Sequence, residues 1–336
     1  MNRAFRALMA GIVDYAGLFP PAQLSLKEAI ESYARYREEP GGWMLGRFVC
    51  PASRLRELLA FRPVFLPKLE EDIPFGFSIL VRAAKGSEEF LIGLEKDLAE
   101  IKAFLQSTEY RVEVDLIEAR LPDEALARHE TERIADLLDE AAERMDAKGL
   151  PLEPFYEIPL SGDWRNGITA AVEAIAKHNA GRRLLDDERA HAKQAGLKVR
   201  CGGATADLFP TSEQLAFLIG ACRDAGICWK ATAGLHNPLR GPDPLTGAPA
   251  HGFLNLFGAG LFAHAKELDN EAIERILDDS PPSRFCVGDE TFAWNDLSLP
   301  VADVARLRQD FARSFGSCSF DDPRAGLREI GYTVEP

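Results

Sequence analysis

The stretch that decides the fold is residues 196–234, GLKVRCGGATADLFPTSEQLAFLIGACRDAGICWKATAG. It begins with a β-rich run at 197–201 and ends with a second β-rich run at 227–232. Between the two runs, Thr211 and Gln214 form a capping box that predicts the start of a helix, and Gly226 predicts its end. A helix between two strands is typical of a parallel crossover unit.

The same alternation of strands and helices continues along the rest of the chain. Eight such units predict a closed (β/α)8 TIM barrel. The alternative is an open doubly wound sheet, but residues 16–20 lack the glycine-rich first turn that is usual there. We expect strands at 11–15, 47–50, 77–81, 111–117, 155–159, 197–201, 227–232 and 284–287, and helices at 25–36, 126–145, 170–177, 185–193, 211–226, 252–266 and 301–315.

The length of 336 residues could hold two domains, but single barrels also reach this size. We predict one barrel over residues 1–315 and a C-terminal tail, residues 316–336, that packs on it. Three long connections, at 16–24, 203–210 and 234–250, follow the first, sixth and seventh expected strands. Barrel enzymes place their chemistry at that end of the strands, so the proline-rich connection at 234–250 is expected to form an ordered lid.

The composition restricts the partners. A net charge of −14 disfavours nucleic acid and anionic membranes, because an acidic surface repels both. No apolar run approaches the roughly 20 residues of a membrane helix, and the N-terminus lacks a secretory pattern. We therefore expect a cytoplasmic protein that binds a small anionic metabolite in a local basic pocket. A homo-oligomer remains open.

Basic residues gather on the sixth and seventh expected strands. Side chains alternate along a strand, so Lys198 and Arg200 share one face, and Lys230 and Thr232 share one face of the next strand. The intervening residues, including Trp229, are apolar and suit the helix layer. The basic residues should therefore point into the barrel, where strands lie about 4.8 Å apart.

A lysine is a nucleophile only when it is neutral, and its ordinary pKa is about 10.4. Burial and neighbouring cations lower that pKa, so Lys198, flanked by Arg200 and Lys230, is the expected nucleophile. Gly202 and Gly203 would leave room for substrate beside it. Lys230 is nearly as good a candidate for the same role. The carboxylates expected to move protons are Asp115 and Glu157.

Other polar residues could line the same end of the barrel. His236 and Arg240, in the connection after the seventh strand, are candidate substrate-binding residues together with Arg200 and Thr232. Asp14 is read as a solvated loop carboxylate, although it could also line the barrel mouth. No histidine pair has the spacing of metal ligands, so neither a metal nor another cofactor is expected.

The order of these motifs resembles the deoxyribose-phosphate aldolase family of class I aldolases, over about 40 residues. The resemblance rests on Lys198-Val-Arg-Cys-Gly-Gly, on the helix start Pro210-Thr-Ser-Glu, and on Lys230-Ala-Thr-Ala-Gly. It implies that Lys198 forms a Schiff base and that Lys230 perturbs it. Arg200 stands where that family has a small hydroxyl residue, and residues 235–238 replace its phosphate-binding turn. The stretch 232–236 is also similar to one in a group of bacterial barrel proteins without an assigned function.

Three functions are compatible with these patterns. The first is a lyase of the aldolase type that acts on a small anionic carbonyl compound through a Schiff-base lysine. The second is an enzyme whose lysines and arginine only clamp a carboxylate or phosphate. The third is a barrel that binds a ligand or partner without catalysis, with its charges paired in a structural network.

Overall fold

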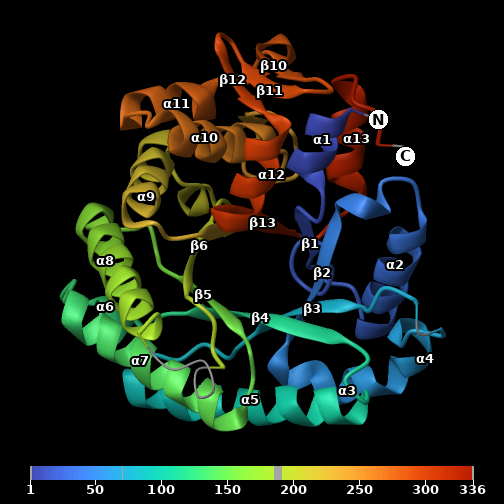
Figure 1. Ribbon diagram of the computed structural model, residues 1–336, viewed down its shortest axis with the longest axis vertical. Helices are drawn as coiled ribbons and strands as arrows, with labels where there is room; N and C mark the ends of the chain where they lie inside the picture. Colours follow the sequence, from blue (N-terminus) through green and yellow to red (C-terminus); the bar gives the residue numbers. More distant parts are fainter. Residues whose placement is uncertain (1, 70, 185–190, 335–336) are drawn as a thin grey trace. The chain divides into compact units, whose positions relative to one another are not determined.

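A computed structural model describes residues 2–69, 71–184 and 191–334. Eight parallel strands close into a barrel in the order β1-β13-β7-β6-β5-β4-β3-β2, and helices alternate with them (Figure 1). The fold is therefore the (β/α)8 barrel that the sequence predicted. The barrel strands are β1 (Val13–Tyr15), β2 (Leu45–Pro51), β3 (Gly76–Leu80), β4 (Glu113–Arg120), β5 (Glu153–Glu157), β6 (Gly196–Arg200), β7 (Trp229–Thr232) and β13 (Ala312–Ser317).

Thirteen α-helices are found in the described part of the chain. The expected helix at 252–266 is confirmed as α10. The expected second helix at 185–193 falls mostly on residues 185–190, which lie outside the described residues. The helices are α1 (Arg3–Met9), α2 (Leu26–Glu38), α3 (Leu55–Leu58), α4 (Arg62–Phe65), α5 (Ser87–Ser107), α6 (Asp123–Leu126), α7 (Thr131–Lys148), α8 (Trp164–Arg182), α9 (Ser212–Ala225), α10 (Phe253–Lys266), α11 (Asn270–Asp278), α12 (Val301–Asp310) and α13 (Asp321–Glu329).

The eighth barrel strand is not the one that the sequence predicted. Residues 284–287 do form a strand, β10 (Phe285–Val287), but it pairs antiparallel with β11 (Thr291–Trp294). That strand pairs with β12 (Leu297–Pro300), so the three form a separate small sheet. The eighth barrel strand is β13, and it begins where the expected helix 301–315 was still to run. The boundary expected between barrel and tail falls inside β13, and α13 follows it.

The chain divides into two compact units. The central unit comprises Ala16–Ala34 and Arg47–Lys198, and the terminal unit comprises Met1–Tyr15, Arg35–Gly46 and Val199–Pro336.

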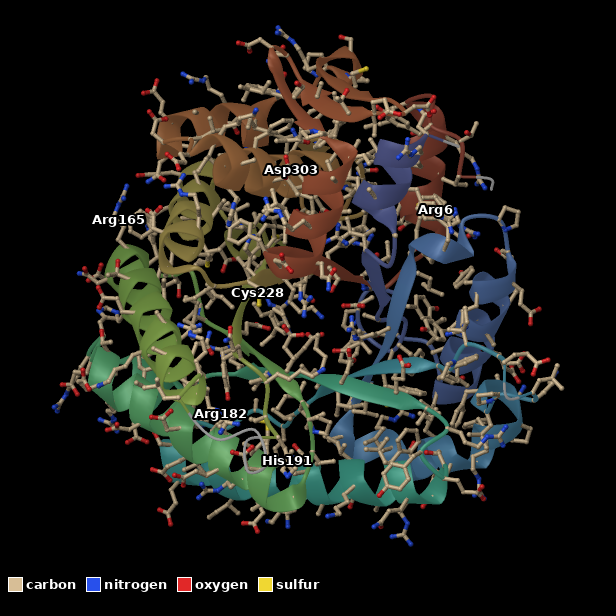
Figure 2. All side chains as sticks on the ribbon, in the orientation of Figure 1. Arg6, Arg165, Arg182, His191, Cys228 and Asp303 are labelled. Atoms are coloured by element: carbon tan, nitrogen blue, oxygen red, sulfur yellow. The ribbon has the colours of Figure 1, made fainter. Side chains whose placement is uncertain are left out.

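In the central unit, helices α5, α7 and α8 cover one side of strands β3 to β5 (Figure 1). Phe77 of β3 packs edge-on against Phe65 of α4 and Phe104 of α5, with ring centroids 5.7 and 5.4 Å apart. Phe77 therefore faces the helices, and its neighbour Ser78 faces the other side of the strand. Arg182, labelled in Figure 2, ends α8 and pairs with Asp146 of α7 at 2.5 Å.

In the terminal unit, the capping box predicted for α9 is confirmed. The Thr211 hydroxyl accepts a hydrogen bond from the Gln214 amide at 3.2 Å, and Gly226 ends the helix with a positive φ of 64°. Trp229 of β7 packs against Phe257 of α10, with ring centroids 5.3 Å apart. A Cβ at position 260 of α10 would lie only 2.7 Å from the Trp229 ring, so a glycine is needed for this close contact.

The connection after β7 is ordered by its own contacts. Its ends form a short antiparallel pair, β8 (Gly241–Pro242) with β9 (Pro249–Ala250). Between them, the Asp243 carboxylate accepts hydrogen bonds from the backbone of Leu245 and Thr246. Within the described residues, no helix has both the length and the apolarity that crossing a bilayer requires.

Candidate active site

Lys198 of β6 lies between two carboxylates of the central unit. Its Nζ is 2.7 Å from Glu118 Oε2 of β4 and 2.8 Å from Glu157 Oε2 of β5. Glu157 and Lys198 are direct neighbours in the register of the two strands. All three side chains are nearly inaccessible, so a charged amine here requires the carboxylates beside it.

Ser78 of β3 completes this group, and its hydroxyl donates a hydrogen bond of 2.7 Å to Glu118 Oε1. An irregularity in the pairing of β3 with β4 places Glu118 here. Phe77 pairs with Val114, but Ser78 pairs with Leu116, so Asp115 is passed over. After Asp115, the even-numbered residues of β4 therefore face the side of the sheet that the odd-numbered residues face before it. We call Ser78, Glu118, Glu157 and Lys198 the lysine-198 cluster.

Within the lysine-198 cluster, two carboxylates face one ammonium. Burial is the largest single influence on the pKa of Lys198 and lowers it, but the charges and hydrogen bonds of Glu118 and Glu157 together raise that pKa above its ordinary value. The resting amine is therefore an ammonium with proton acceptors in contact. This direction is opposite to the lowered pKa expected from the sequence, because the nearest charges are carboxylates.

Lys230 of β7 has a different environment in the terminal unit. Because Trp229 packs on α10, Lys230 faces the opposite side of the strand, as predicted. Its Nζ is 2.8 Å from Asp14 Oδ2 of β1, and Ser314 of β13 donates a hydrogen bond of 2.6 Å to the same oxygen. Lys230 and Asp14 are both fully buried. Asp14 is thus not the solvated loop residue that was expected.

The structure places Asp115 away from the lysine-198 cluster. Its carboxylate forms a bidentate pair with Arg47 of β2, at 2.8 and 2.6 Å. Burial raises the pKa of Asp115, but the hydrogen bonds and the charge of Arg47 outweigh it, so the pKa lies below its ordinary value. Glu157 is therefore the one of the two expected proton-transfer residues that contacts Lys198.

Two of the four expected substrate-binding residues lie at strand ends, and the other two contact helices of the terminal unit. Arg200 ends β6 and is exposed, and Thr232 ends β7. His236 Nδ1 lies 3.2 Å from Asp322 Oδ2 of α13. Arg240 contacts Asp278 of α11 and also His251, at 3.3 and 3.0 Å. These contacts attach the connection after β7 to the helices of the terminal unit.

Gly202 and Gly203 serve the packing of the chain. A Cβ at position 202 would lie 2.6 Å from the Cα of Gly234, and one at position 203 would overlap Leu208. Gly234 itself has a positive φ of 72°. These two glycines are therefore needed for close packing against Gly234 and Leu208.

The sequence interpretation missed the residues that give each lysine its environment. Glu118 lies one residue beyond the expected end of its strand. Strict alternation would also put its side chain on the opposite face from Glu113 and Asp115. Ser314 lies in a segment expected to be helical. Ser78 is a single serine in an otherwise apolar strand, and a polar residue at such a position is the one signal that could have been used.

Metal binding can be judged only from the side chains in the described ranges. In residues 2–69, 71–184 and 191–334, no three His, Cys, Asp or Glu side chains are grouped so that they could hold a metal ion.

The fold and these contacts define a (β/α)8-barrel protein with a lysine–carboxylate contact in each of its two compact units. In comparisons with known protein families and with curated proteins, no family model and no curated protein matches the chain.

Proposed function

We propose that the protein is an enzyme of the lyase or aldolase type that forms an imine between Lys198 and a small carbonyl compound. The observation that carries this proposal is the contact of the buried Lys198 amine with two carboxylates, at 2.7 and 2.8 Å. A buried nucleophile in hydrogen-bond contact with a base is the general arrangement of covalent catalysis. The local resemblance to class I aldolases points to the same residue.

The contacts of Lys198 match the proton transfers that imine formation requires. The ammonium gives a proton to a neighbouring carboxylate, and the neutral amine attacks the carbonyl carbon. The new N–C bond forms as the carbonyl electron pair moves to oxygen, and that oxygen takes up a proton from the attacking nitrogen. The resulting hydroxyl leaves as water with the one proton that the carboxylic acid holds, and an iminium ion remains. The iminium ion accepts the electron pair of an adjacent C–C bond when that bond breaks.

Lys198 is the better nucleophile of the two lysines. Lys230 is fully buried, and the carboxylate that it contacts, Asp14, also accepts a hydrogen bond from Ser314. Lys198 has two acceptors, of which Glu157 ends its strand on the side where barrel enzymes bind substrate.

A clamp for an anion is less well supported than imine formation. In a clamp the Lys198 amine would bind the anion directly, whereas the contacts of this amine are with two carboxylates.

Reductive trapping tests this function. The protein is incubated with borohydride and a panel of one aldehyde, one ketone and one 2-oxo acid, and the intact mass is measured. We expect a covalent adduct on the unmodified protein and none on Lys198→Arg, because a guanidinium group cannot form the imine but keeps the positive charge beside both carboxylates. Lys177→Arg, which changes an exposed lysine of α8 paired with Glu132, is the matched control and should be labelled normally. Equal labelling of Lys198→Arg would exclude the proposal.

A further inference from the structure

The two carboxylates beside Lys198 are held differently. Glu118 is 3% exposed, lies inside β4 and accepts a hydrogen bond from Ser78 in addition to its contact with Lys198. The side chain of Glu157 is 12% exposed, and Glu157 is the last residue of β5. The two groups therefore differ in how easily each can give a proton to, or take one from, a molecule at the end of the strands.

The hydrogen bond from Ser78 favours the ionised form of Glu118. A carboxylate that accepts a hydroxyl donor on one oxygen and an ammonium donor on the other is stabilised in its ionised form. Protonation of Glu118 would weaken both contacts at a site that water reaches poorly. Glu118 is thus suited to remain ionised and to fix the position of Lys198.

Glu157 has the more suitable place for proton transfer. The C-terminal ends of the strands are the side on which (β/α)8 enzymes bind substrate, and Glu157 lies at that end of β5. Its Oε2 is 2.8 Å from the Lys198 nitrogen, so a carbon adjacent to an imine on Lys198 would lie near the same carboxylate.

We propose that Glu157 transfers protons to and from the carbon next to the imine, while Ser78 and Glu118 are positioning residues for Lys198. This division of roles rests on the proposed function. In the step, the Cα–H bond of the iminium ion breaks and its proton goes to a Glu157 oxygen. The C–H electron pair forms a Cα=C bond, and the C=N electron pair moves to nitrogen, which gives a neutral enamine. The reverse step returns the proton from Glu157 to Cα.

Isotope exchange separates this step from imine formation. In heavy water the proton on Glu157 is replaced by deuterium, which is then returned to the substrate carbon. Using the carbonyl compound of the panel that is trapped best, we would follow exchange at its Cα by NMR and trapping by intact mass. The variants are Glu157→Gln, Glu118→Gln and Ser78→Ala, and a thermal melt of each verifies folding.

We expect Glu157→Gln still to form the trapped adduct, but more slowly, because Lys198 loses one proton acceptor. Exchange per trapped adduct should fall by about 100-fold or more, within the range of general acid–base catalysis. Glu157→Asp keeps the charge and should recover part of the exchange. Glu118→Gln and Ser78→Ala should keep exchange within about tenfold of the unmodified protein while the pH dependence of trapping moves.

The outcomes distinguish this division of roles from the proposed function. Trapping of the unmodified protein together with normal exchange by Glu157→Gln would overturn the role of Glu157 and leave the imine in place. Loss of exchange in Glu118→Gln with normal exchange in Glu157→Gln would reverse the two roles. Absence of trapping with every compound of the panel would overturn both proposals.

Discussion

Lys198 and Lys230 carry the same side chain and are similarly buried, but their neighbours differ. The Lys198 amine contacts Glu118 and Glu157, and the Lys230 amine contacts Asp14, which also accepts a hydrogen bond from Ser314. At the scale of the residue, the two carboxylates beside Lys198 hold a proton on its amine, because their charges and hydrogen bonds raise its pKa. The sequence pointed to both lysines as inward-facing, but it could not assign carboxylates from distant strands to them.

The raised pKa of Lys198 predicts a definite pH dependence. The amine is charged at neutral pH, so the rate of adduct formation with cyanoborohydride should rise with pH. Glu118→Gln removes one negative charge and lowers the pKa of Lys198, so the rising limb should move to lower pH. A limb that moves to higher pH, or does not move, would show that Glu118 does not hold the proton on Lys198.

Tyr156 of β5 tests how a buried hydroxyl group without a hydrogen-bond partner affects stability. Its hydroxyl is buried and has no hydrogen-bond partner in the structure, and burial raises the pKa of this phenol. Tyr156→Phe removes an unsatisfied polar group, so the free energy of unfolding should stay unchanged or rise by about 1 kcal/mol.

The matched control for Tyr156 is Tyr36→Phe. The hydroxyl of Tyr36 donates a hydrogen bond of 2.7 Å to Asp321, and its loss should cost about 1 kcal/mol or more. Urea unfolding of both variants measures the difference. A clear loss of stability in Tyr156→Phe would show that this hydroxyl is satisfied in solution.

At the scale of the elements, an ion pair and a hydrogen bond at Asp14 join three barrel strands of the terminal unit. Asp14 of β1 accepts contacts from Lys230 of β7 and Ser314 of β13. Breaking a buried pair by removing one partner leaves an uncompensated charge, so Lys230→Met should lower the free energy of unfolding by about 3–5 kcal/mol.

The double variant Lys230→Met/Asp14→Asn checks the origin of that loss. It should recover a substantial part of the lost free energy of unfolding, because both charged groups of the pair are then removed together. Urea unfolding of both single variants and of the double variant completes the cycle. A double variant that is as unstable as the sum of the single variants would contradict direct coupling of the two side chains.

The elements also show what the sequence could predict. The strands up to β7 were found because their apolar runs lie between helix caps such as Thr211 and Gly226. The last strand was missed because residues 312–317, ARSFGS, contain few β-branched or aromatic residues, whereas 285–287, FCV, look like a strand. Glu118 was missed because the irregular pairing of β3 with β4 reverses the alternation on which the prediction relied.

At the scale of the whole molecule, the barrel closes with β13 between β1 and β7. The order of the strands follows from the alternation of strands and helices. Each helix connects two strands that lie next to each other, and the last strand then pairs with the first. The candidate site is less predictable than the fold, since its contacts join strands that are distant in the sequence, such as β4 and β6. Fold and chemistry are only loosely coupled in barrels, so the site residues have to be tested directly.

The measurement that tests the account most directly is the position of the trapped adduct in the unmodified protein. After borohydride reduction with the best compound of the panel, the chain is digested and the modified peptide is identified by mass spectrometry. The account predicts modification of Lys198 in the peptide that contains β6. Modification of Lys230, or equal labelling of exposed lysines such as Lys177, would contradict it.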